Sequence, residues 1–372
     1  MLLAMQILAG LVIFATFWEL LPRDEWWVRG FDFPRIQFIV IAVVVLALLV
    51  IFDDEIVIID ICLLIMLAIA LIFQLRMVLP YTFLWKKEVK NAENLDETHQ
   101  IKLLVSNVLT PNDNKQALLN HVKTYQPDIL LTLETDQAWE NALAVIEDDY
   151  PYQVKIPLDN LYGMHLYSRL ELIDPEVKFL IVDDIPSIHT QLRLKNGEVV
   201  RLYCLHPMPP SPTEADKSTT RDAELLMVGE EINHNDYPAI LAGDLNDVAW
   251  SRTTRMFQRV SGLLDPRIGR YFINTFHVKY PFFRWALDHV FHSNVFSFVN
   301  MARLPSIGSD HFPVLTVLQY EPQARHEQAE PTPTAEDHAE SYKAIEEGKK
   351  EGEKLSDERE EDKAEQKVTI NV

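Results

Sequence analysis

AILAGDLND, residues 239–247, begins as a buried strand and ends on polar groups. Gly, Asn and Asp favour turns, so the simplest interpretation of the polar half is a turn after a core strand. Loops at strand ends are also where enzymes concentrate catalytic residues. The stretch alone does not separate these interpretations, so the rest of the chain has to be read with it.

The chain is acidic, with 55 Asp and Glu against 34 Lys and Arg in 372 residues. A net charge of −21 argues against a protein that binds nucleic acid tightly and without sequence preference, which needs a broad basic surface. The two cysteines, Cys62 and Cys204, exclude a disulfide framework and a thiolate metal site.

Three apolar runs lie in the first 80 residues, at 1–20, 36–52 and 56–73. A membrane-spanning helix needs about 20 apolar residues, with about 17 at the lower end. We therefore predict a membrane anchor of about three transmembrane helices over residues 1–80. A cleaved signal peptide is the alternative for the first run.

The charges between the runs predict an orientation. The loop at residues 53–55 is acidic, and the basic residues lie in the first loop and after the third run: Arg23, Arg29, Arg35, Arg76, Lys86, Lys87 and Lys90. Basic loops stay in the cytoplasm. The pattern predicts a multi-pass protein of the inner membrane, with the N-terminus outside and the large domain in the cytoplasm.

Residues 99–320 form the predicted catalytic domain, after a linker at 81–98. Strand-like segments alternate with helix-like ones, which predicts a layered α/β or α+β domain built around sheets. Residues 321–372 are rich in Glu and Lys and poor in large apolar side chains. We expect this tail to be disordered, or a solitary solvated helix.

Polar residues close or follow several predicted strands: Asn107, Glu134, His206, Asp244 and Asn246. Asp310 and His311 lie just before the last predicted strand. A single such residue, Asn107 or Asn246 for example, is readily explained as a cap or turn. Their recurrence favours a catalytic site. Carboxylates with amides suit a hard divalent cation such as Mg²⁺, and a His beside an Asp suits stabilisation of a phosphate.

The chain resembles the endonuclease/exonuclease/phosphatase superfamily, which includes DNase I. The resemblance is carried by SNVL, QPDILLTLE, HPMPP, GDLND, LDHVF and SDHFPV, in order, over about 220 residues. It is closest to membrane-anchored bacterial members of unassigned substrate. The resemblance implies a DNase I-like four-layer sandwich of two packed β-sheets flanked by helices, here preceded by transmembrane helices.

The resemblance also implies a metal site. Glu134 would be the principal ligand of Mg²⁺, with Mn²⁺ as the alternative ion. Asn107 would help to hold the ion, and Asp310 would lie near it.

The implied catalytic residues follow from the same motifs. Asp244 would orient or deprotonate the attacking water, and Asn246 would hold a phosphate oxygen. His311 would contact the scissile phosphate, oriented by Asp288. His206 would be a further group on the phosphate side.

These features predict a membrane-anchored, metal-dependent hydrolase of phosphodiester or phosphomonoester bonds, whose partners are the lipid bilayer and a phosphate-ester substrate such as a phospholipid headgroup or a small ester. A nuclease acting on DNA or RNA is the first alternative, and a non-enzymatic membrane scaffold with a relict domain is the second. The nuclease alternative depends on a basic cluster after GDLND: Arg252, Arg255, Arg259, Arg267 and Arg270. A solvated helix face explains the cluster equally well.

Overall fold

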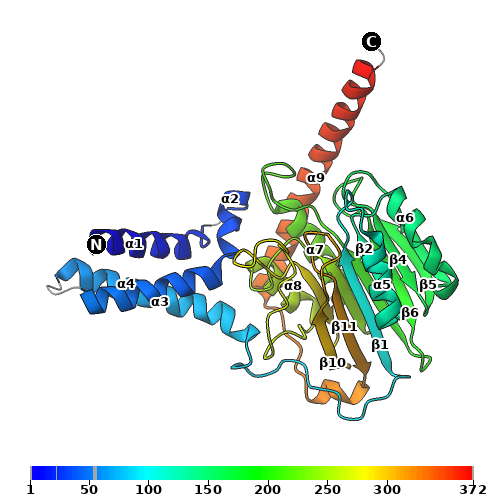
Figure 1. Ribbon diagram of the computed structural model, residues 1–372, viewed down its shortest axis with the longest axis horizontal. Coiled ribbons are helices and arrows are strands. Elements are labelled where there is room, and N and C mark those ends of the chain that lie inside the picture. The colour runs from blue at the N-terminus through cyan, green and yellow to red at the C-terminus, as the bar shows by residue number, and fades with distance from the viewer. Residues whose placement is uncertain (1, 22, 53–56, 371–372) are drawn as a thin grey trace. The chain divides into compact units, whose positions relative to one another are not determined.

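A computed structural model describes residues 2–21, 23–52 and 57–370 (Figure 1). The chain divides into two compact units. The first contains residues 1–86 with the segments 210–218 and 268–272, and the second contains the remainder.

The second unit contains a six-stranded sheet in the order β10-β11-β1-β2-β4-β3. Its strands are β1 (Gln100–Asn107), β2 (Ile129–Leu133), β3 (Tyr152–Ile156), β4 (Met164–Ser168), β10 (Phe296–Arg303) and β11 (Val314–Tyr320). Only β1 and β2 are parallel neighbours, and the other pairs are antiparallel. The carboxyl ends of β1 and β2 therefore lie at the same edge of this sheet.

A five-stranded sheet has the order β5-β6-β7-β8-β9. Its strands are β5 (Glu171–Lys178), β6 (Ser187–Arg193), β7 (Val199–Leu205), β8 (Ala239–Asp244) and β9 (Asp288–His292). Here β7 and β8 are the parallel pair. The two sheets pack face to face through alternating apolar residues such as Leu103 and Val105 of β1 with Leu202 of β7 and Ile240 of β8.

Helices cover the outer faces of both sheets. α5 (Lys115–Tyr125), α6 (Gln137–Leu143) and the 3₁₀ segment η3 (Ala144–Asp149) pack on the six-stranded sheet. α7 (Thr219–Asn233) and α8 (Arg252–Ser261) pack on the five-stranded sheet. The predicted four-layer, DNase I-like sandwich is confirmed.

The charged tail differs from the disorder that we expected. It forms a long helix, α9 (Ala335–Ile370), which follows the short 3₁₀ segment η4 (Pro322–His326). Its first half packs on α7 and α8. The composition of the tail indicates disorder because it offers few large apolar side chains for burial.

Two glycines and several ion pairs hold α9 in place. A Cβ at Gly348 would lie 2.1 Å from the Cβ of Ala223 in α7, and one at Gly352 would lie 2.1 Å from the carbonyl oxygen of Ile181. The absence of side chains at these two positions lets the helix backbone approach its neighbours closely. Salt bridges add to this contact, among them Asp337 with Arg259 at 2.6 Å, and Glu340 with Arg252.

The first unit contains α1 (Leu2–Trp18), α2 (Trp26–Arg29), η1 (Gly30–Asp32), α3 (Arg35–Phe52), α4 (Ile58–Val78) and η2 (Leu79–Tyr81). Among the described residues, only the continuous segment Ile58–Tyr81 is long and apolar enough to cross a membrane, with a mean hydropathy of 2.8. Trp26–Asp32 and Arg35–Ile51 pass that test only as a pair bent by 65°, and Leu2–Trp18 is shorter. Three spans, and with them the multi-pass arrangement, are therefore not supported. The acidic loop used to predict orientation lies outside the described residues.

Replacing Gly348 with leucine is expected to detach α9 from α7, because the new side chain would overlap Ala223 and the carbonyl oxygen of Thr219. Overpacking of this kind lowers the free energy of unfolding by about 1–3 kcal/mol. Hydrogen exchange of the α9 amides should speed up markedly. Lys349→Leu changes an exposed neighbour on the same helix and is the matched control. Equal exchange in the two variants would show that the glycine contact does not hold α9.

Candidate active site

Asn107 and Glu134 meet at the edge where the parallel strands β1 and β2 end. The register pairs Asn107, the last residue of β1, with Leu133, the last residue of β2. Glu134 directly follows Leu133 and therefore lies next to Asn107. The Asn107 Nδ2 donates to Glu134 Oε1 at 2.7 Å and to Asp244 Oδ2 at 3.1 Å. Since Asp244 ends β8, this single amide joins the edges of the two sheets.

Asp244 and Asp288 face each other across the antiparallel pair β8–β9. The strand reaches this point through Gly243, whose φ is +151°. A Cβ at Gly243 would lie 1.9 Å from the carbonyl oxygen of Leu205 on β7. Only glycine fits between these strands, which explains why the aspartate follows a glycine.

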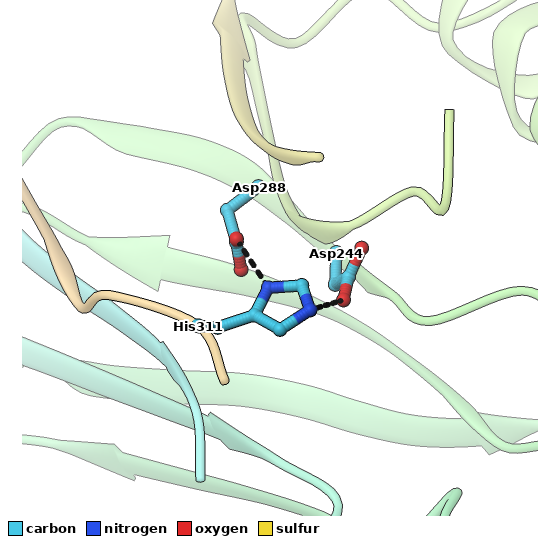
Figure 2. A group of neighbouring side chains, drawn as sticks. All are labelled: Asp244, Asp288 and His311. Carbon is cyan, nitrogen blue, oxygen red and sulfur yellow. Dashed lines mark hydrogen bonds and ion pairs between the residues drawn. The ribbon is translucent and has the colours of Figure 1, made fainter. Parts of the chain in front are cut away.

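His311 lies between these two carboxylates, in the loop before β11 (Figure 2). Its Nδ1 is 2.8 Å from Asp288 Oδ2, and its Nε2 is 3.5 Å from Asp244 Oδ2. The Ser309 Oγ fixes the loop, because it donates to the Asn107 carbonyl oxygen at 2.8 Å and accepts from the His311 amide at 3.0 Å.

The imidazole of His311 is held in its charged form. Burial opposes the charge, but the carboxylates of Asp244 and Asp288 more than offset burial and raise the pKa of His311 to about 10. Burial also raises the pKa of the Asp288 carboxyl, and the neighbouring imidazolium opposes that rise. We assign the shared proton to His311, because two carboxylates flank its ring.

Glu134 is a buried carboxylate with too little compensating charge. Burial raises its pKa to about 7, the negative charges of Asp310 and Asp244 add to the rise, and the Asn107 hydrogen bond and the charge on His311 oppose it. Its backbone has a φ of +61°, in the left-handed region. Its carbonyl oxygen accepts from the Thr110 Oγ1 at 2.8 Å.

Asn246 and His206 also lie beside Asp244. The Asn246 amide donates to Asp244 Oδ1 at 3.0 Å, and its Nδ2 donates to the Pro207 carbonyl oxygen at 3.0 Å. The His206 Nε2 is 4.0 Å from Asp244 Oδ2, and its ring centroid is 5.3 Å from that of Tyr162. Burial lowers the pKa of His206 to about 4, so this imidazole is neutral at neutral pH.

The structure brings the predicted site residues together. Seven of them are linked by the contacts above, and Asp310 is close enough for its charge to act on Glu134 and His311. Three supporting residues were not predicted from the sequence: Ser309, Thr110 and Thr275. The Thr275 Oγ1 accepts from the Asp288 amide at 3.3 Å. Ser309 could have been noticed within SDH, whereas nothing in the sequence marks the two threonines.

The donor atoms fit a hard divalent cation. Asp244, Asp288 and His311 offer three ligand atoms within 4.8 Å of one another. Both ring nitrogens of His311 already face carboxylates, so this trio is better described as a buried ion-pair cluster. Glu134, with Asn107 and Asp310 beside it, offers oxygen donors and an unbalanced negative charge, which is the chemistry that Mg²⁺ prefers.

Most arginines of the basic cluster are engaged in contacts within the protein. Arg252 and Arg259 pair with acidic residues of α9, and Arg267 is buried against Asp265 at 2.7 Å. Arg270 is buried in the first unit. These contacts favour the structural explanation of the cluster.

Comparisons with known proteins agree with this geometry. The model of the Endonuclease/Exonuclease/phosphatase family matches residues 104–311. D. rerio TDP2, solved with a single-strand DNA product, is 18% identical with a TM-score of 0.50, over 60% of this chain and 100% of that chain. The likeness to TDP2 shows a shared fold.

Two further solved structures are similar. The human nocturnin catalytic domain with bound sulfate is 17% identical with a TM-score of 0.49, over 61% of this chain and 96% of that one. An endonuclease/exonuclease/phosphatase family protein from Bacteroides thetaiotaomicron is 20% identical with a TM-score of 0.48, over 60% and 98%. No curated protein sequence matches significantly.

Asp288→Asn is expected to lower the pKa of His311, because it removes one of the two carboxylates that hold the proton. The native imidazole should stay charged until the pH rises to about 10, and the variant should lose its proton at least about one pH unit earlier, equivalent to about 1.4 kcal/mol. NMR titration of histidine-labelled protein measures this, with His311→Gln to assign the signal. Asp113→Asn, at an exposed position, is the control. An unchanged midpoint would contradict the assigned pairing.

Proposed function

Because the chain belongs to the endonuclease/exonuclease/phosphatase family, we propose that it is a membrane-attached, Mg²⁺-dependent hydrolase of phosphodiester or phosphomonoester bonds. The observation that carries this proposal is the set of buried contacts that joins Asn107, Glu134 and Asp244 to the His311–Asp288 pair. Membership of a family of phosphoric ester hydrolases sets aside the non-enzymatic scaffold.

The buried side chains divide the chemistry among them. Asp244, beside the imidazolium, accepts a proton from the attacking water. His311 directs positive charge towards the phosphate oxygens, and Asp288 keeps its ring oriented and protonated. Asn246 positions a phosphate oxygen, and His206 contributes a neutral polar ring to the same side.

The proposed cation site lies beside Glu134. Glu134, Asn107 and Asp310 would hold Mg²⁺, with Mn²⁺ as the alternative, and the ion would offset negative charge on the phosphate. The raised pKa of Glu134 supports this assignment, because a carboxylate that lacks a positive partner in the protein is suited to receive one.

Membrane attachment is supported by the apolar surface of the first unit. All three long helices expose large apolar side chains, including Leu3 of α1, Val50 of α3, and Ile58 and Ile72 of α4. Exposed apolar surface of this extent marks contact with lipid or protein. We propose that Ile58–Tyr81 crosses the membrane. A cytoplasmic location for residues 99–320 stays a prediction.

Polar side chains buried between these helices tie the others to α4. Arg35 pairs with Asp32 at 2.9 Å and donates to Gln74 at 3.0 Å, and Gln74 donates in turn to Thr16 at 3.2 Å. These hydrogen bonds connect α1 and α3 to the segment that we propose crosses the membrane.

For the substrate, we favour a phospholipid headgroup or a small phosphate ester. The arginine cluster that motivated the nuclease alternative is largely engaged in ion pairs within the protein. The nuclease alternative retains the support of the TDP2 complex with single-strand DNA, at a level of identity that shows the fold alone.

Asp244→Asn and His311→Ala are each expected to lower kcat by about 10²- to 10⁴-fold, because they remove the proton acceptor and the positive charge. The full-length chain in nanodiscs, with Mg²⁺, is assayed on a chromogenic phosphodiester, inositol phosphates, mixed phospholipids and plasmid DNA. Asp113→Asn should retain native activity. Native rates in both site variants would refute the site assignment, and plasmid nicking without lipid or ester hydrolysis would favour the nuclease.

Removal of the cation by EDTA is expected to abolish hydrolysis, and Mg²⁺ or Mn²⁺ should restore it. Glu134→Gln keeps the shape of the side chain but removes its charge, so the variant should need a higher Mg²⁺ concentration for half-maximal activity. The measurement is activity against Mg²⁺ concentration, with Glu97→Gln at an exposed position as the control. Activity that survives EDTA, or an unchanged Mg²⁺ requirement, would contradict the metal site.

A further inference from the structure

Three aromatic side chains project from one loop beside the site. Tyr280, Phe282 and Phe283 are 57%, 82% and 58% exposed. Together with Pro281 they form a stretch that we call the aromatic tip (residues 280–283). Large aromatic side chains seldom cluster on the surface of a soluble protein, and exposed patches of this kind mark interaction sites.

The loop that carries the aromatic tip is well ordered by hydrogen bonds. The Phe283 amide donates to the Tyr280 carbonyl oxygen at 2.9 Å, which closes the turn. Below it, the Phe276 amide donates to the Trp285 carbonyl oxygen at 3.0 Å. The exposed aromatic side chains are therefore carried by a hydrogen-bonded turn.

The surroundings of the tip are positively charged in an otherwise acidic chain. Between Asp265 and Asp310 the only acidic residue is Asp288, which is buried. The tip is flanked by Lys279 and Arg284. The guanidinium groups of Arg284 and Arg303 lie 4.9 Å and 4.5 Å from the centre of the Phe312 ring.

The base of this loop contacts the catalytic residues directly. The Phe276 ring centroid is 4.9 Å from that of His311, and the Val278 amide donates to the Asp310 carbonyl oxygen at 2.8 Å. Whatever the aromatic tip binds is thus brought close to the site.

We propose that the aromatic tip inserts into the interface of a lipid bilayer, with the flanking cations on anionic headgroups, and so presents the active site to phosphate esters at the membrane surface. Aromatic side chains favour the boundary between headgroups and acyl chains, and basic residues next to them add electrostatic attraction to anionic lipids. This inference rests on the proposed function, since it names the surface on which that hydrolase acts.

A bilayer fits these observations better than nucleic acid does. Platforms for single strands place aromatic rings along a basic groove, so that successive bases stack while the backbone follows the charges. Here the three rings lie within four residues of one turn, and Phe282 carries no polar group. Insertion of a compact apolar tip explains that arrangement.

The test uses a nitroxide label on the full-length chain. Phe282→Cys is labelled in a Cys62→Ser background, where the remaining Cys204 is buried. The protein is reconstituted in vesicles of phosphatidylcholine and phosphatidylglycerol, and collisions of the label with oxygen are compared with collisions with a water-soluble nickel chelate. The matched control is Val145→Cys, an apolar position of the same unit that is 73% exposed.

We expect the ratio of oxygen to nickel collisions to be severalfold higher at position 282 than at 145. Equal, water-like ratios would overturn the inference, as would a label at 282 that responds to a single-stranded oligonucleotide and not to lipid. Flotation and hydrolysis are measured on the same vesicles. A chain that floats and hydrolyses its substrate while position 282 stays in water overturns only this inference, and a chain that does not float overturns the membrane attachment with it.

Discussion

The hydrogen bonds from the Asn107 amide hold the candidate site together, because they connect carboxylates that belong to different sheets. One bond goes to Glu134 at the end of β2 and the other to Asp244 at the end of β8. Both sheets contain one parallel pair, β1–β2 and β7–β8, so the carboxyl ends of four strands lie at their facing edges. In layered α/β proteins, ligands bind outside such carboxyl ends. The fold thus brings the strand ends of the two sheets together, and the Asn107 amide links the carboxylates of both sheets into one site.

Electrostatics then decide what the site can bind. Glu134, Asp244, Asp288 and Asp310 gather around a single imidazolium, that of His311. Leaving buried carboxylates without compensating charge is costly, and the raised pKa of Glu134 expresses that cost. A divalent cation lowers this free-energy cost, because it supplies the positive charge that the carboxylates lack. The same surplus of negative charge would repel a bare phosphate, which is why a phosphate-ester hydrolase of this design calls for a metal.

Much of this could be predicted from sequence, because the strand-end motifs combine local pattern with unusual residue types. GDLND places a carboxylate where an apolar strand ends, SDH places another just before the last strand begins, and the structure brings the two motifs together. The docked helix of the charged tail could not be predicted in this way. Its composition indicates disorder, whereas its docking depends on Gly348 and Gly352 meeting α7 and residue 181, contacts that composition does not encode. The ion pairs of Arg252 and Arg259 after GDLND could not be predicted for the same reason, since their partners lie on α9, far along the chain.

Backbone conformation and hydrogen bonding differ among the polar residues at these strand ends. Asn246 and Glu134 both have left-handed backbones, with φ of +51° and +61°, although neither is glycine. Such conformations cost about 1–3 kcal/mol for most residues and persist where the surroundings enforce them, often at functional sites. Asp247, by contrast, accepts hydrogen bonds from the Val248 amide and from Thr254 at the start of α8. Its carboxylate is occupied by the fold, while those of Asp244 and Glu134 lie in the cluster around His311. Asp247 therefore fits the turn interpretation of this stretch, and the catalytic interpretation of Asp244 and Asn246 stays a prediction.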